Sequence, residues 1–399
     1  MDQIISFIPN DKVDKYIRIT SERYGDLSSN GFVSKSSISS TVLGISKTFS
    51  QFEMIIKAQP NSGMTETEIN IGKIINILRL SCPHFILTLG HIKCKSQNPL
   101  GLKKISNICS TSGNLLEKSM SYIFLEYIPE TISLSELIKQ QTNNVDQIYN
   151  IIVQSLLAIK WANKVSNFTH YDLHCSNILA QNISKSNCNF NFIMKYMNLS
   201  SDPNEICQVA TGDYLAFIID YGFSHIDGVV PSYTYNKSTG ITPEESCHMN
   251  DIYTLITSFI KYITINKPSL IKYKIIENLI REYLYLFYEL FNHIVKYDDK
   301  DKQVEYLFKI INNIILSKEN IDRRYKMLIS FYNMGTERFW FLPLAKRQKL
   351  QTDSNFDEYI NTFVINICKE DIITKNVLSQ PHKDRIIHVM SSNKIIINN

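Results

Sequence analysis

Residues 168–180 read FTHYDLHCSNILA, and four chemically capable side chains stand there between two apolar runs: His170, Asp172, His174 and Asn177. Polar groups surrounded by apolar chain are expected to be hydrogen-bonded or to serve a chemical role, because burying them unpaired costs free energy. Three interpretations of the stretch are open: a metal site, a polar turn and a catalytic loop. The segments before and after it distinguish between them.

The composition fits a protein with a large core and two lobes or domains. The chain has 399 residues, of which 44% are hydrophobic, and this is enough to bury an extensive interior. The net charge of +4 is spread along the chain, so no clear nucleic-acid partner is expected. The eight cysteines form no C-x-x-C pair and no zinc pattern with histidine, which indicates reduced thiols in an intracellular protein.

Targeting and membrane segments are not recognisable in the sequence. The first residues, MDQIISFIPNDKVDKY, lack the basic region and apolar core of a signal peptide, so we do not expect a secreted protein. The longest apolar run of the middle, residues 253–265, is interrupted by Lys261 and is too short to span a bilayer. We therefore expect an intracellular protein without a membrane partner.

The residue pattern predicts a β-rich N-terminal part with one main helix, followed by a mainly helical part. We expect strands at 31–39, 40–46, 51–59, 85–94, 121–128 and 213–223. We expect helices at 65–80, 131–140, 146–164 and through most of 250–350. Residues 1–27 are expected to contain a short helix, 96–119 a polar loop and 181–213 a polar insertion.

The helix predicted at 65–80 has a recognisable start and end. Its apolar residues recur at helical spacing, Thr65 can cap the first turn, and Glu68 stands three residues later as the reciprocal partner. Gly72 lowers the helix propensity of the segment, and Cys82-Pro83 ends it.

Three segments, taken together and in this order, resemble the protein-kinase-like superfamily. Residues 170–177, HYDLHCSN, match its catalytic-loop pattern H-x-D-L-x-x-x-N. Residues 220–222, DYG, follow an apolar strand and resemble the D-F-G element. Upstream, MIIKA places Lys57 at the end of an apolar strand, as in the V-A-I-K element. The gap between the first two motifs is wider than in the family, and the insertion at 181–213 accounts for it.

This resemblance implies the catalytic residues Asp172, His170 and Asn177 and the cofactors ATP and Mg²⁺. Asp172 would accept the proton of the acceptor hydroxyl or orient the attacking oxygen. Asn177 and Asp220 would hold Mg²⁺. In the alternative interpretation His170, His174 and Asp172 would form a metal site, but further ligands are lacking nearby in the sequence.

The resemblance also implies the contacts to the nucleotide phosphates. Lys57 would hold the α- and β-phosphates, fixed by a carboxylate of the next helix, with Glu68 as the first choice and Glu66 as the second. The phosphate-binding loop would be SSNGFVSKSS, which keeps Gly31 and has serines where the family has its other glycines. Small residues of this kind still allow backbone amides to face a phosphate.

Two further segments resemble elements of the same superfamily. FLEYIPE resembles the hinge, with Leu125 at the gatekeeper position and backbone groups from Glu126 to Ile128 facing the adenine. MNDIYTLITSF resembles the helix after the activation segment, and its Asp251 would hydrogen-bond to the backbone of the catalytic loop. Asp251 also suits the first turn of a helix, where the macrodipole favours a carboxylate.

Departures from the family pattern bear on regulation and on the substrate. Tyr171 replaces the arginine that pairs with a phosphorylated activation-loop residue, so we expect activity that does not require this phosphorylation. His174 replaces the lysine of most Ser/Thr kinases and would contact the γ-phosphate. The D-L-H sequence is common in small-molecule phosphotransferases and occurs in kinases of large DNA viruses. Residues 242–244, TPE, are a shortened form of the A-P-E element.

The expected fold is α+β and bilobal, with a small β-rich lobe at 1–128 and a larger, mainly helical lobe at 129–399. The expected function is that of an ATP-dependent Ser/Thr protein kinase that resembles the divergent enzymes of large DNA viruses. It would act on a protein hydroxyl in the host cytoplasm or the virion. Two alternatives stay open: a small-molecule kinase of the aminoglycoside or choline-kinase type, and a non-catalytic pseudokinase scaffold. Four residues required for phosphoryl transfer are retained and favour catalysis: Lys57, Asp172, Asn177 and Asp220.

Overall fold

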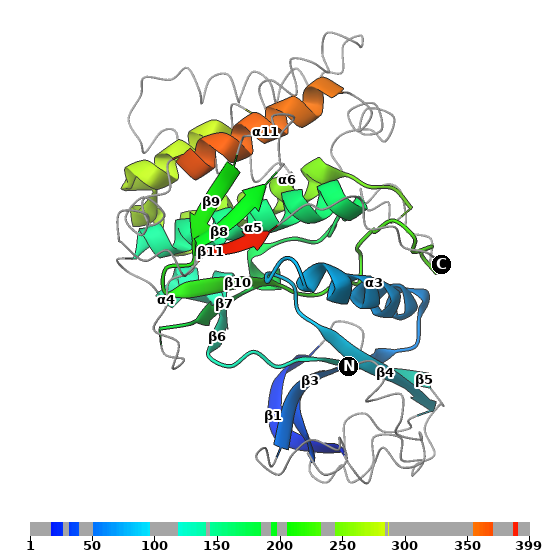
Figure 1. Cartoon of the computed structure of the whole chain (residues 1–399). Helices are drawn as coiled ribbons and strands as arrows, with labels where there is room; N and C mark the ends of the chain where they lie inside the picture. The colour runs from blue at the N-terminus through cyan, green and yellow to red at the C-terminus, as the bar shows by residue number, and fades with distance from the viewer. Residues whose placement is uncertain are drawn as a thin grey trace. The chain divides into compact units, whose positions relative to one another are not determined.

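The computed structural model (Figure 1) describes residues 17–26, 32–39, 51–95, 119–140, 144–184, 193–197, 206–232, 244–283, 286, 354–369 and 386–389. Several expectations lie outside these residues: Gly31, the strand at 40–46, most of the polar loop at 96–119 and the helices between 287 and 350. Within the described part of the chain, no helix combines the length and the hydropathy needed to cross a membrane.

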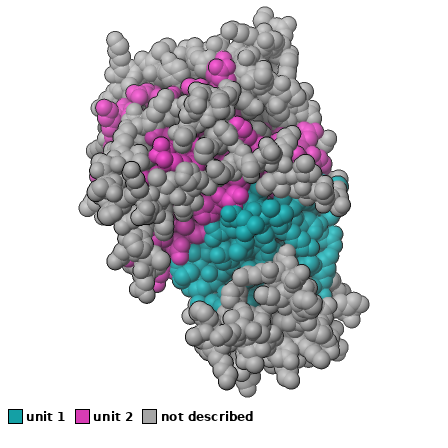
Figure 2. Space-filling model, viewed as in Figure 1, with its two compact units in different colours: residues 1–80, 85–129, 229–233 teal, residues 81–84, 130–228, 234–399 magenta. Residues whose placement is uncertain are grey.

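The chain divides into two compact units, drawn in teal and magenta in Figure 2. Unit 1 consists of residues 1–80, 85–129 and 229–233, and unit 2 of residues 81–84, 130–228 and 234–399. Unit 1 is built on a sheet and one described helix, and unit 2 is mainly helical, so the fold class is α+β with two lobes. Residues 81–84 belong to unit 2, and His84 O accepts a hydrogen bond from Ile218 N of the same unit at 2.7 Å.

Unit 1 contains a five-stranded antiparallel sheet in the order β1-β2-β3-β5-β4. Its strands are β1 (Ile17–Asp26), β2 (Phe32–Ser39), β3 (Gln51–Pro60), β4 (Thr88–Lys95) and β5 (Ser119–Glu126). The described part of the 1–27 segment, which was expected to contain a helix, is strand β1. Ile17 and Ile19 alternate there with polar residues, which is the two-residue period of a strand.

Helix α3 (Gly63–Arg79) follows β3, and it begins earlier than expected. Ser62 is the N-cap in place of Thr65, because its Oγ accepts a hydrogen bond from Thr65 N at 3.2 Å. The Thr65 hydroxyl instead donates to Pro60 O at 3.0 Å. Since the cap lies three residues earlier, Glu68 stands in the second turn and is not the reciprocal partner of the cap.

Gly72 allows α3 to approach β4 closely. A Cβ atom at Gly72 would lie 2.2 Å from Thr88 Oγ1, so a side chain does not fit there. One turn later, Asn76 binds both backbone polar groups of Thr88: Nδ2 donates to Thr88 O at 2.7 Å, and Oδ1 accepts from Thr88 N at 2.8 Å. These contacts fix the helix that carries Glu68 against the sheet.

Unit 2 is organised around helix α5 (Val145–Ser166), most of whose residues are buried. Further elements are α4 (Leu134–Gln140), α6 (His248–Asn266), α11 (Ser354–Lys369), a helical segment at 274–283 and the 3-10 turns η1 (Cys175–Asn177) and η3 (Pro268–Lys272). Asn167 is the C-cap of helix α5, with a left-handed φ of 52° and an N–H that donates to Asn163 O at 2.7 Å. The chain then turns into the stretch 168–180.

A small antiparallel sheet in the order β10-β7-β6 lies directly beside both motifs of unit 2. Its strands are β6 (Thr131–Ser133), β7 (Ile178–Asn182) and β10 (Tyr214–Ile218). Strand β6 corrects the helix expected at 131–140, which begins only at Leu134. Ser133 Oγ accepts a hydrogen bond from Glu136 N at 3.2 Å, so this serine marks the helix start.

The insertion at 181–213 contains a sheet of its own, which the polar composition of the segment did not indicate. Strands β8 (Ile193–Met197) and β9 (Ile206–Ala210) form an antiparallel pair. Strand β11 (Ile386–Val389) pairs with β8 in parallel, as the red arrow beside the green ones in Figure 1 shows. Ile193, Met194 and Tyr196 are buried, so the insertion packs a small apolar cluster within its polar surroundings.

Buried amides on α5 hold the chain that leads into β10. Gln154 Nε2 donates to Tyr214 O at 3.0 Å, and its Oε1 accepts from Ala216 N at 2.9 Å. One turn earlier, Asn150 donates to Ala210 O. Because both amides are fully buried and both bind backbone, they fix the strand before the DYG motif to the central helix.

We expect Gly72→Ala to lower the free energy of unfolding by about 1–3 kcal/mol, because the added methyl group overpacks the contact with Thr88. Lys73→Ala, at the exposed neighbouring position, is the control and should change stability by less than about 0.5 kcal/mol. Urea denaturation followed by circular dichroism measures both variants. Equal stability of the two would contradict the close approach of α3 to β4.

Candidate active site

The register of the small sheet joins the two motifs of unit 2. Strand β7 begins directly after Asn177, and its Ile178 pairs with Ile218 at the end of β10. Ile219 N then donates to Asn177 O at 3.1 Å. The catalytic-loop motif and the residue before Asp220 are therefore hydrogen-bonded neighbours.

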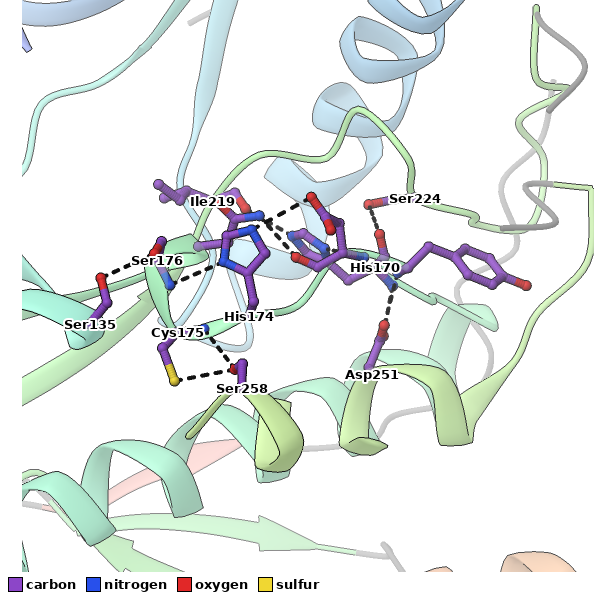
Figure 3. Close-up of polar contacts among 12 residues, drawn as sticks. Ser135, His170, His174, Cys175, Ser176, Ile219, Ser224, Asp251 and Ser258 are labelled. Carbon is purple, nitrogen blue, oxygen red and sulfur yellow. Dashed lines mark hydrogen bonds and ion pairs between the residues drawn. The ribbon is translucent and has the colours of Figure 1, made fainter. Parts of the chain in front are cut away.

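Asp251, in the first turn of α6, holds the backbone of the loop, as the sequence predicts (Figure 3). Its Oδ2 accepts from His170 N at 2.7 Å, and its Oδ1 accepts from Tyr171 N at 2.8 Å. The carboxyl group is fully buried, and this burial raises the pKa of Asp251 to about 7, although the two N–H donors act in the opposite direction. One side chain thus accepts hydrogen bonds from two adjacent backbone N–H groups.

His170 connects the loop to the strand before Asp220 through both ring nitrogens. Nε2 lies 2.8 Å from Ile219 O, and Nδ1 accepts from Asp172 N at 3.3 Å. Because a carbonyl oxygen only accepts, Nε2 carries the proton, and burial lowers the pKa of His170, which favours the neutral ring. With both nitrogens engaged, the metal-site interpretation finds no support, and no group of three or more His, Cys, Asp and Glu suited to a metal ion occurs among the described residues.

Two residues of the motifs adopt a left-handed backbone that non-glycine residues rarely use. Tyr171 has a φ of 64° and Asp220 a φ of 69°. Such conformations cost on the order of 1–3 kcal/mol each and persist only where surrounding contacts impose them. Asp251 imposes the first, and the bonds of Ile219 to His170 and Asn177 constrain the second. Strain at both motifs is typical of functional sites.

The loop itself orients Asn177. Its Nδ2 donates to Asp172 O at 2.9 Å, and its backbone N donates to His174 O at 2.8 Å. Since the amino group is used in this way, Oδ1 is the atom that Asn177 presents as a ligand. An amide oxygen and the carboxylate of Asp220 are hard oxygen donors of the kind that Mg²⁺ prefers, so the donor set fits that ion.

His174 faces Asp172 and caps the short turn η1. Its Nδ1 accepts from Ser176 N at 3.2 Å. Its Nε2 lies 3.7 Å from Asp172 Oδ2, which is too long for a hydrogen bond but close enough for an ion pair when the ring is protonated. About 34% of the His174 side chain and 14% of the Asp172 side chain are exposed, so both groups can meet a substrate.

Cys175 lies inside the loop and has a structural role. Ser258 Oγ accepts from Cys175 N at 3.1 Å and lies 3.3 Å from its sulfur (Figure 3). The thiol is fully buried, and burial raises the pKa of Cys175 to about 12. It is therefore protonated at neutral pH and does not act as a nucleophile or redox group.

In unit 1, Lys57 of β3 and Glu68 of α3 form a buried ion pair. Lys57 Nζ lies 2.7 Å from Glu68 Oε1, and Gln59 Nε2 donates to Glu68 Oε2 at 2.9 Å. The other candidate carboxylate, Glu66, is about half-exposed and pairs with Lys93 instead. The lysine and the first-choice glutamate thus meet in the structure, while their role toward a nucleotide stays a prediction.

Glu126, at the end of β5, uses its side chain within unit 1. Its carboxylate accepts from Leu87 N at 3.2 Å and lies 3.5 Å from Arg79 Nη2, and its backbone N donates to Leu87 O at 2.9 Å. Glu126 can therefore offer adenine only its carbonyl group. Ile128, the other predicted hinge contact, has a buried side chain and would contribute backbone alone.

Two residues that hold the loop carry no recognisable sequence signal. Ser224 Oγ donates to His170 O at 3.2 Å (Figure 3). Thr169 exchanges two backbone hydrogen bonds with His225, at 3.0 and 2.7 Å. The two residues that hold the loop, Ser224 and His225, stand shortly after the DYG motif. Both bind backbone groups of the loop, and the sequence does not reveal such partners.

We expect Glu68→Gln to lower the free energy of unfolding by about 1.5–3 kcal/mol, because it removes the negative charge that pairs with the buried ammonium group of Lys57. Glu66→Gln is the matched control, since the same change removes only an exposed ion pair, and no resolvable loss is expected. Thermal and chemical unfolding report both variants. A larger loss for the control would mean that the buried pair contributes less than its geometry implies.

Asp251 should make stability fall as the pH rises from about 4 to about 7. Its carboxyl group has an ordinary pKa of 3.8 when unfolded and about 7 when folded, so the folded state binds the proton more tightly in that window. The loss is at most about 1.4 kcal/mol per pH unit. The measurement is the free energy of unfolding of wild type and of Asp251→Asn at several pH values, and only the wild type should show this decrease. The same pH dependence in both proteins would contradict the prediction.

No protein-family model matches the chain. The chain is 24% identical over 241 residues to a protein named "Probable kinase 098L" of Invertebrate iridescent virus 3, which covers 58% of this chain and 38% of that protein. It is also 31% identical over 136 residues to the uncharacterized protein 038R of the same virus, which covers 33% of this chain and 24% of that protein.

The chain spans well under half of the length of the curated relatives that it matches. At this level of identity, the first relative supports a kinase-like protein with viral relatives and leaves the kind of substrate open. That conclusion agrees with an α+β chain whose catalytic-loop and DYG motifs share one hydrogen-bonded network.

Proposed function

We propose that the chain is an ATP-dependent phosphotransferase and, more specifically, a Ser/Thr protein kinase. The observation that carries this proposal is the network of unit 2. In this network His170 joins the backbone of Asp172 to Ile219, the residue before Asp220. Asn177 completes it, because its side-chain amide donates to Asp172 O and its backbone carbonyl accepts from Ile219 N. This arrangement would present a base and two metal ligands at the edge of one small sheet, which suits phosphoryl transfer.

In the proposed reaction, Asp172 orients a Ser or Thr hydroxyl and accepts its proton. The hydroxyl oxygen forms a bond to the γ-phosphorus of ATP as the bond from that phosphorus to the bridging oxygen breaks, and ADP leaves. The protein contributes positioning and charge stabilisation and forms no covalent intermediate. Asp172 suits this role because its side chain is partly exposed while His170 and Asn177 fix its backbone.

Asn177 and Asp220 would hold Mg²⁺, which when bound supplies positive charge beside the phosphate oxygens. Lys57 would contact the α- and β-phosphates, and Glu68 would keep its ammonium group in place. Gly31 and the backbone of Glu126 and Ile128 are the proposed contacts of the phosphate loop and the adenine. His174 would approach the γ-phosphate from its position beside Asp172.

A small-molecule kinase is the second candidate, and a specific feature favours it. His174 gives the D-L-H sequence that is common in small-molecule phosphotransferases, and the short segment before α6 leaves little chain for docking a peptide. Gly222 after the second metal ligand favours a protein kinase instead. A non-catalytic scaffold would not need the buried pair of Lys57 and Glu68.

Purified protein incubated with labelled ATP and Mg²⁺ distinguishes the three functions. Label on a mixture of generic acceptor proteins supports the protein kinase, and label on small amines or alcohols supports the second candidate. Nucleotide binding without transfer to either class of acceptor indicates the scaffold. Phosphoamino-acid analysis of the labelled protein then tests whether serine and threonine are the acceptors.

Asp172→Asn should reduce the rate of phosphoryl transfer by about 10²–10⁴-fold, the usual contribution of a general base, while leaving the fold intact. Asp227→Asn is the control, since Asp227 is a half-exposed carboxylate of the same unit without a proposed role. Initial rates with saturating MgATP and circular dichroism spectra provide the comparison. Unchanged transfer in Asp172→Asn would overturn the assignment of the base.

A further inference from the structure

Residues 169–171 contact two different segments with alternating side chains. His170 points to the strand before Asp220, where its Nε2 meets Ile219 O at 2.8 Å. Thr169 and Tyr171, on either side of it, both contact residues 245–247, which directly precede α6.

Tyr171 contacts the segment through its phenol group. The hydroxyl donates to Glu245 O at 2.5 Å, and the side chain is only 1% exposed. The direction of the ring depends on the left-handed φ of 64°, which the bond from Tyr171 N to Asp251 imposes. The strain at Tyr171 therefore accompanies a specific contact, and the hydrogen bond to Glu245 contributes to offsetting its cost.

Thr169 contacts the next two residues of the segment. Its Oγ1 accepts from Cys247 N at 2.8 Å and lies 3.1 Å from Ser246 Oγ. Asn163 Nδ2, from the last turn of α5, also lies 3.1 Å from Ser246 Oγ. Thr169 is fully buried, so these bonds are shielded from water.

The contacts are reciprocal. The side chains of Thr169 and Tyr171 hold residues 245–247, and Asp251, one turn into the helix that follows this segment, holds the backbone of His170 and Tyr171. Every side chain of this set that binds residues 245–247 is uncharged: a phenol, a hydroxyl and an amide. No phosphate is needed to make such bonds, in contrast to an arginine that must pair with a phosphorylated residue.

We propose that Thr169 and Tyr171 form a phosphate-independent latch, which holds residues 245–247 against the catalytic loop and so positions the protein acceptor. The inference rests on the proposed kinase function, because it assigns these residues to binding of the acceptor. Thr169 and Tyr171 are positioning residues, since they act through the segment and do not touch the reacting atoms. The latch explains physically why a tyrosine can stand in place of the arginine.

The test compares Tyr171→Phe with Tyr149→Phe in the full chain. Tyr149 is a matched control, because its buried hydroxyl also donates to a backbone carbonyl of unit 2, Ile367 O at 2.8 Å, away from the latch. Tyr171→Phe should speed amide hydrogen exchange in peptides covering 244–248 by about threefold to tenfold, the change expected from losing one hydrogen bond. Tyr149→Phe should leave that exchange unchanged.

The KM values for the acceptor and for ATP distinguish a role in positioning the acceptor from a purely structural role. Tyr171→Phe should raise the KM for a protein acceptor by about threefold to tenfold and leave the KM for ATP unchanged. Thr169→Val should have the same effect, and Thr169→Ser, which keeps the hydroxyl, should restore wild-type values. Treatment of the wild type with phosphatase should leave the KM for the acceptor unchanged.

The outcomes separate the latch from the proposed function. Unchanged exchange at 244–248 in both Tyr171→Phe and Thr169→Val overturns the latch, whatever the activity. Faster exchange with an unchanged KM for the acceptor overturns the positioning role, and loss of activity after phosphatase treatment overturns phosphate independence. If the wild type transfers phosphate to no acceptor, the proposed function fails, and hydrogen exchange alone decides the latch.

Discussion

The buried carboxylate of Asp251 is the constraint on which the geometry of the catalytic loop depends. Two adjacent backbone N–H groups point at it, and neither could be left unpaired in the interior without a cost of about 1–3 kcal/mol. By holding them, Asp251 imposes the left-handed turn at Tyr171, aims the phenol at one segment and leaves the His170 ring facing another. A single side chain of α6 therefore fixes the backbone of two neighbouring residues whose side chains point to different segments.

The two units stabilise their proposed functional residues through different kinds of interaction. In unit 1, a buried charge pair links β3 to α3, and its cost of desolvation is compensated by a short bond and a further amide donor. In unit 2, the Asp251 carboxylate holds the loop together with several bonds between backbone and neutral side chains. The first arrangement is sensitive to removal of either partner, while the second combines one carboxylate with a larger number of neutral hydrogen bonds.

Much of the site is visible in the sequence because it depends on residue type and order. Lys57 and Glu68, the loop stretch and Asp251 belong to short segments whose spacing indicates their chemistry, and long helices such as α5 follow from periodicity. The rest of the site depends on backbone groups and distant segments, which the sequence does not reveal. Tyr171, for example, binds the backbone carbonyl of Glu245, which any residue could supply. The strands of the insertion pair with a segment near residue 386, so the local composition of the insertion alone suggests a polar loop.

The pairing of β11 with β8 has a consequence for the order in which the molecule assembles. Ile193 pairs with Ile386, so one edge of β8 has no partner strand until the chain has been synthesised as far as residue 386. Contacts between such distant positions are formed late, because a long stretch of chain must first be brought together. On the ribosome, the insertion would pass through a period with an exposed edge that invites mispairing with other nascent chains.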